Sequence, residues 1–176
     1  MWYFDRMTGG DSSYLDLCAL CALIDVFCHY ESEKHWHEPQ NYREFLRKLD
    51  PAFRKKLPVI IPTTRFKGGS LELVNLRDRA DVFYTGVRCS LHHHGDLASY
   101  AGMDCTAELA TELPNAVRQV GDTTEYPMII FNPAKIKTSL RQWLDNYCDE
   151  LLKKPNGYNA QSFKNKFQND FGISIR

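Results

Sequence analysis

One stretch decides the fold that we expect: LELVNLRDRADVFYTGVRCSLHHHG, residues 71–95. Apolar side chains recur in it at helical spacing and would share one broad face: Leu73, Leu76, Ala80, Phe83, Tyr84 and Val87. The pattern predicts a helix over residues 71–93, and Gly95 is typical of the position just after a helix. Arg88 and three adjacent histidines would therefore lie at the end of this helix.

Further helices are expected on both sides of this stretch. Residues 12–31 follow a glycine pair and carry apolar residues at helical spacing. A short amphipathic helix over 42–49 ends at Asp50-Pro51, because proline disfavours a helical conformation in the residue before it. Asn132-Pro133 begins a long amphipathic helix, since asparagine caps helices and proline suits the first helical position. A shorter helix, marked by three phenylalanines, is expected within residues 157–171.

Little strand structure is expected. Residues 126–131, YPMIIF, form a short continuous apolar run that is typical of a strand. Residues 53–70 contain prolines and two adjacent glycines, which indicates a loop with an extended piece at 59–61. Residues 96–125 have weak periodicity and predict a surface excursion with a helical turn near 106–112. The predicted fold class is therefore mainly all-α, a bundle of four to five helices with a short strand or hairpin before the long C-terminal helix.

The composition limits the class of protein. A chain of 176 residues with 43% hydrophobic and 12% aromatic residues can bury one core. We expect a single helical domain over 1–176, with its core in 12–152 and a helical extension at 157–171. Because 22 basic residues balance 22 acidic ones, no global field would attract nucleic acid, and any RNA contact must be local.

No membrane partner is expected, and the predicted location is the cytoplasm. The longest apolar run, residues 14–28, contains two aspartates and is shorter than the roughly 20 residues that span a bilayer. Residues 1–10 lack the pattern of a secretory signal. The six cysteines are irregularly spaced, and three lie in one apolar helix, which indicates reduced core packing rather than a disulfide framework.

The segment from Arg88 to His94 concentrates reactive side chains. It places a permanently charged guanidinium within one or two turns of three imidazoles that titrate near neutral pH. A histidine can move a proton to or from the oxygens of a phosphodiester, while an arginine stabilises charge on its non-bridging oxygens. Such chemistry needs no metal, so no cofactor is expected. A merely polar helix end is the competing interpretation.

Two other patterns suggest metal binding and are disfavoured. Cys18 and Cys21 have the spacing of a zinc or redox pair, but both lie within an apolar helix and no second pair matches them. Metal ligation could also involve His92, His93, His94 and Asp96. Adjacent histidines on one helix point in different directions, however, so they cannot all bind one ion. We therefore predict no metal site.

A basic stretch is the candidate RNA-binding region. Its positive residues could contact phosphates, although charge in a loop is more often only solvated. The candidates are Arg54, Lys55, Lys56, Arg65 and Lys67.

Arg88 and His93, with four residues between them, resemble the motif of the HEPN family (higher eukaryotes and prokaryotes nucleotide-binding). This family consists of compact helical bundles whose motif is an arginine, four to six residues and a histidine. The likeness covers roughly residues 12–152, including the NYREFL helix and the FYTGV stretch that runs into RCSL. The resemblance implies a metal-independent endoribonuclease that leaves a 2′,3′-cyclic phosphate, with a composite site formed between two copies of the chain. It assigns the chemistry to Arg88 and His93, with His94 as the second choice of histidine.

The expected function is therefore cleavage of single-stranded RNA by a homodimer from a bacterial toxin, defence or stress system. The alternative is a catalytically degenerate relative that binds RNA or a cognate protein, as an antitoxin or regulatory partner. Cys89 favours the alternative, because it follows the arginine where the family often has asparagine or another polar residue. A thiol cannot supply the same hydrogen bonds.

Overall fold

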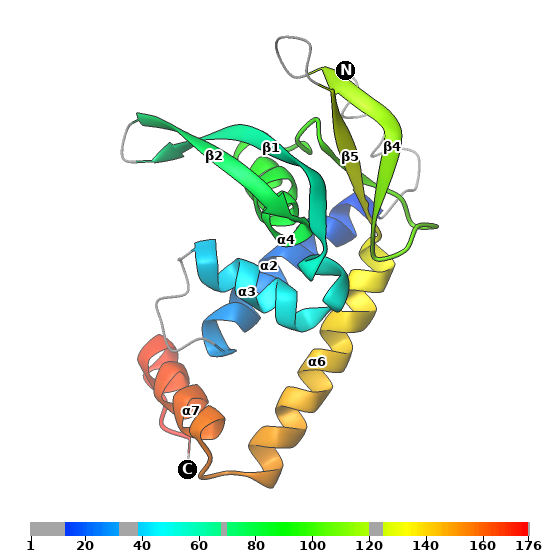
Figure 1. Ribbon diagram of the computed structural model, residues 1–176. Coiled ribbons are helices and arrows are strands. Elements are labelled where there is room, and N and C mark those ends of the chain that lie inside the picture. The colour runs from blue at the N-terminus through cyan, green and yellow to red at the C-terminus, as the bar shows by residue number, and fades with distance from the viewer. Residues whose placement is uncertain (1–12, 32–38, 68–69, 120–124, 176) are drawn as a thin grey trace.

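The computed structural model describes residues 13–31, 39–67, 70–119 and 125–175, and Figure 1 shows how their elements are arranged. The elements in chain order are α2 (Ser13–Glu31), α3 (Pro39–Leu49), the 3-10 helix η1 (Pro51–Arg54), β1 (Lys56–Lys67), β2 (Ser70–Asp78), α4 (Arg79–Val82), the π-helix η2 (Phe83–Cys89), α5 (Ser90–His94), β3 (Ala101–Met103), β4 (Ala110–Gln119), β5 (Glu125–Phe131), α6 (Pro133–Lys153) and α7 (Tyr158–Phe171). One sheet consists of β1 and β2, and the other has the strand order β3-β5-β4. The fold is an α+β mixture, so the prediction of a mainly all-α bundle is wrong.

Four predicted helices are confirmed in the described residues as α2, α3, α6 and α7. Residue 12, the predicted start of the first helix, lies outside those residues. The last helix, α7, packs against the end of α2, where Asp170 Oδ2 lies 3.0 Å from His29 Nε2 and accepts a hydrogen bond from Tyr30. In the part of the chain that the structure describes, no helix combines the length and the apolar character needed to cross a bilayer.

The largest correction concerns residues 56–78, for which the sequence pattern predicts a loop and the start of a helix. They form an antiparallel hairpin of β1 and β2. Apolar residues of β2 lie on both faces of this hairpin: Leu71 and Leu73 are 70% and 72% exposed, whereas Leu76 is buried opposite Ile61. A spacing that also fits a helical face is thus used in a strand, because pairing with β1 overrides the local preference. The helix begins at Arg79, where the Asp78 side chain accepts a hydrogen bond from Asp81 N.

A second correction concerns residues 96–125, for which a surface excursion is expected. β3 runs parallel to β5, and β4 runs antiparallel to β5 on its other side. The helical turn predicted near 106–112 is wrong, since Ala110 begins β4 and its carbonyl accepts a hydrogen bond from the buried guanidinium of Arg79. The three residues of β3 are too few to show an alternating pattern. The strand predicted at 126–131 is confirmed as β5.

The core is centred on three phenylalanines from distant parts of the sequence. Phe53, Phe83 and Phe131 are each 0% exposed. The Phe83 ring centroid lies 5.5 Å from that of Phe53 and 5.1 Å from that of Phe131, in edge-to-face geometry. Such pairs add to the free energy gained by burying aromatic area. The three rings therefore fix the helix of residues 79–94 to η1 on one side and to the β3-β5-β4 sheet on the other.

Substitution of Asn132 should strongly destabilise the fold. Its side chain accepts a hydrogen bond from Lys135 N, as the sequence predicts for a helix cap, and its Nδ2 donates to the carbonyls of Cys105 and Ala107 at 2.8 and 2.7 Å. Asn132→Asp keeps the cap but places a buried carboxylate against two carbonyl oxygens, so the free energy of unfolding should fall by about 3 kcal/mol or more. Urea unfolding tests this expectation, with Asn146→Asp on the exposed face of α6 as the control. An equal effect of both substitutions would contradict it.

Candidate functional site

Arg88 lies on a helix whose middle turns are π-helical. This helix runs from α4 through η2 to α5, and Gly95 ends it with a φ of 69°, which confirms the predicted helix end. π-Helical turns are rare in proteins as a whole, but those that occur often lie at functional sites. Gly86 allows η2 to approach the strand region closely, because a Cβ there would lie 2.5 Å from Cε2 of Tyr100. The backbone two residues before Arg88 is therefore closely packed against Tyr100.

The guanidinium of Arg88 is held by Asp25 on α2. Its Nε and Nη2 lie 3.2 and 3.1 Å from the same oxygen, Oδ2 of Asp25, and both side chains are a little over one-fifth exposed. The Tyr84 ring also lies beside it, with its centroid 5.8 Å from Arg88 Cζ. Burial by itself lowers the pKa of Arg88, but Asp25 and Cys89 more than offset this effect, so the pKa is raised. The guanidinium is a fixed positive charge at any physiological pH.

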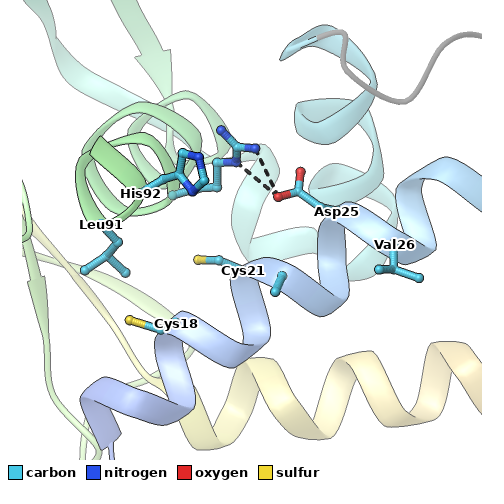
Figure 2. Close-up of a pocket in the computed structure, with 8 residues that line it drawn as sticks. Cys18, Cys21, Asp25, Val26, Leu91 and His92 are labelled. Carbon is cyan, nitrogen blue, oxygen red and sulfur yellow. Dashed lines mark hydrogen bonds and ion pairs between the residues drawn. The ribbon is translucent and has the colours of Figure 1, made fainter. Parts of the chain in front are cut away.

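A pocket of about 630 Å³ opens beside this ion pair, and Figure 2 shows the side chains that form it. Its lining residues come from α2 and from the helix of residues 79–94: Cys18, Cys21, Ala22, Asp25, Val26, Arg88, Leu91 and His92. Burial raises the pKa of the Cys21 thiol to about 12 and also raises that of Cys18. At neutral pH both are uncharged thiols, so they add no charge to the pocket wall.

The three histidines differ in their relation to this pocket. All three are exposed, but His92 lines the pocket, four residues after Arg88, whereas His93 and His94 are not among the lining residues. The ring of His93 lies 5.0 Å from that of His92 and 6.4 Å from that of His94, measured between centroids. Motif spacing points to His93, but the structure brings His92 to the pocket of Arg88. In the described residues, no three His, Cys, Asp or Glu side chains are arranged to hold a metal ion.

The candidate RNA-binding residues lie apart from the pocket lining where the structure describes them. Arg54, Lys55 and Lys56 are exposed on η1 and at the start of β1, and Arg54 Nε donates to the carbonyl of Arg47. Arg65 and Lys67 belong to β1, but their side chains fall outside the described part of the structure. The pocket and the described basic residues are thus separate features of the surface.

Reasoning from the sequence misses Asp25 as a site residue and the contact of Cys89 with Tyr84. Asp25 is the ion-pair partner of Arg88, and its signal is that it is one of two aspartates within the apolar run of α2. Cys89 is half-buried against Tyr84. Burial is the main cause that raises the pKa of Tyr84 to about 12, and the neighbouring Cys89 contributes to the same shift. The phenol therefore stays neutral.

Comparison with protein-family models, with curated proteins and with solved structures finds no match to this chain. The function must therefore be inferred from the geometry of the site.

Cys21 should react with iodoacetamide far more slowly than the exposed Cys148 at pH 8. The thiolate is the reactive form, and burial raises the pKa of Cys21 to about 12. Because the folded-state pKa is raised, the labelling rate should climb with pH up to that value. Site-resolved mass spectrometry over a pH series measures both rates, and denatured protein is the control in which they converge. Equal rates in the folded protein would show that Cys21 is not buried in the pocket wall.

Proposed function

We propose that this protein is a metal-independent endoribonuclease that cuts single-stranded RNA in the pocket of Arg88. The observation that carries the proposal is the fixed positive charge of Arg88, which Asp25 holds at the edge of an open pocket. Three histidines follow Arg88 closely in the sequence. The resemblance of Arg88 and His93 to the HEPN motif supports the same reaction. It adds a bacterial toxin, defence or stress context, and the sequence pattern adds a cytoplasmic location.

The proposed reaction uses the ribose 2′-hydroxyl of the RNA as the nucleophile. The 2′-oxygen forms a bond to phosphorus and the bond from phosphorus to the 5′-oxygen breaks, which leaves a 2′,3′-cyclic phosphate. One neutral imidazole removes the proton of the 2′-hydroxyl, and a second, protonated imidazole delivers a proton to the departing 5′-oxygen. The N–H groups of Arg88 that do not contact Asp25 stabilise the charge on the non-bridging oxygens.

The proposed homodimer gives His93 a role although it does not line the pocket of its own chain. The exposed face of α2 is apolar, with Leu15, Leu23 and Val26 between 45% and 57% exposed, and Val26 also lines the pocket. An apolar stripe of this kind marks an interface. We propose that two copies join through this face and that the exposed His93 of one copy transfers a proton in the pocket of the other, in a composite site.

Cleavage of a labelled single-stranded RNA in EDTA tests the proposal. Arg88→Ala and His93→Ala should each lower the rate by about 100-fold or more, because they remove charge stabilisation and proton transfer. Arg141→Ala, a loss of an exposed arginine on α6, is the matched control and should cut like the parent protein. The product should carry a 2′,3′-cyclic phosphate.

The same assay contains the outcomes that overturn the proposal. Equal cutting by Arg88→Ala would remove this site from the reaction, and a larger loss in His92→Ala than in His93→Ala would reassign the proton transfer. Retention of RNA without any cleavage would identify the protein as the degenerate binding module that Cys89 suggests.

A further inference from the structure

We propose that the pocket beside Arg88 binds a nucleobase, and that Asp25 selects bases with an amino group, namely adenine, cytosine and guanine, over uracil. This inference rests on the proposed function, because it uses Arg88 as the group that holds the RNA phosphate. It adds a specificity-determining role for Asp25 that cleavage alone does not require.

One oxygen of Asp25 is not used by the ion pair. Both contacts from Arg88 are made to Oδ2. No described residue donates a hydrogen bond to Oδ1, although the side chain lines the pocket and is 22% exposed. A carboxylate oxygen accepts hydrogen bonds and cannot donate them. Asp25, a residue of the pocket lining, therefore keeps one acceptor oxygen that the guanidinium does not occupy.

The remaining walls suit a flat apolar ring. Ala22, Val26 and Leu91 contribute hydrocarbon, and Cys18 and Cys21 contribute uncharged thiols. Figure 2 shows Leu91 and His92 on one side of the pocket and the residues of α2 on the other. The volume of about 630 Å³ lies within the range of roughly 300–1,000 Å³ that is usual for small-molecule sites. A base can enter between these walls while Arg88 holds the adjoining phosphate.

The acceptor at Asp25 distinguishes the bases by their hydrogen-bonding edges. Adenine, cytosine and guanine each carry an exocyclic amino group that can donate to a carboxylate, as in the pairing of aspartate with cytosine N4. Uracil carries carbonyl oxygens at those edges, and its single N–H lies between two of them. Its approach to Oδ1 therefore brings carbonyl oxygens against a negative charge. A site with such a polar group disfavours a ligand that cannot complete the hydrogen bond.

Binding of ribonucleoside 3′-monophosphates tests the inference without any cleavage. Isothermal titration calorimetry should give Kd values for the adenosine, cytidine and guanosine nucleotides that are about 10-fold or more below that of the uridine nucleotide. Arg88→Ala should weaken all four, because it removes the phosphate contact. Equal affinity for all four nucleotides would overturn the selectivity.

Asp25→Asn provides the sharper variant. Arg88 can only donate hydrogen bonds, so it would hold the amide oxygen and leave the NH₂ group facing the base. The site would then present a donor, and the preference should shift toward the uridine nucleotide. Asp145→Asn, on the exposed face of α6, is the control that should keep the original order. An unchanged order in a folded Asp25→Asn protein, checked by circular dichroism, would contradict the role of Asp25.

The two proposals fail separately in these experiments. RNA cleavage in EDTA with no binding of mononucleotides would overturn the base site while leaving the ribonuclease. Selective binding of the nucleotides with no cleavage of RNA would support the base site and overturn the catalytic proposal.

Discussion

Phe53, Phe83 and Phe131 meet from three distant parts of the chain, and the packing of their rings positions η1, the helix of residues 79–94 and the β3-β5-β4 sheet relative to one another. Phe53 comes from the short turn before the hairpin, Phe83 from the first π-helical turn and Phe131 from the end of β5. Because all three are fully buried, none of these elements can shift without exposing aromatic surface or leaving a cavity. Arg88 follows Phe83 by five residues on the same helix, so its position is set by this packing.

The ion pair of Arg88 and Asp25 is the opposite kind of interaction, polar and partly exposed. A pair of this kind contributes little to stability by itself. It fixes the direction of the guanidinium, since two N–H groups on one edge contact the same carboxylate oxygen. The surrounding thiols and aliphatic groups keep other charges away, and the phenol of Tyr84 stays neutral. The pocket thus combines a largely apolar wall with one oriented ion pair, that of Arg88 and Asp25.

The sequence predicts those parts of the structure whose signals are local. α2, α3, α6 and α7 carry apolar residues at helical spacing, and Asn132 with Pro133 marks a helix start by residue type alone. β2 could not be predicted in this way, because its leucines fit a helical face until the pairing with β1 is known. The contact of Asp25 with Arg88 depends on how two helices pack together, and spacing within either helix carries no trace of it.

The histidines show a subtler limit. Motif spacing points to His93, whereas the direction of each side chain depends on the number of residues per turn before it. The π-helical turn of η2 changes that number, and its sequence, FYTGVRC, contains no residue type that marks such a turn. Gly86 is its closest signal, but a glycine within a helical pattern does not by itself distinguish a π-helical turn from a regular helix that packs closely against a neighbour.

Asp25 and Arg88 are separated by 63 positions in the chain. Neither α2 nor η2 alone contains a charged pocket, so the site comes into existence only when the two helices have docked. During synthesis, a ribosome-bound chain that ends before residue 88 holds the carboxylate without its guanidinium. Because the position of Arg88 also depends on Phe131, the order of synthesis delays the appearance of the site until residue 131 has been made, about three-quarters of the way along the chain.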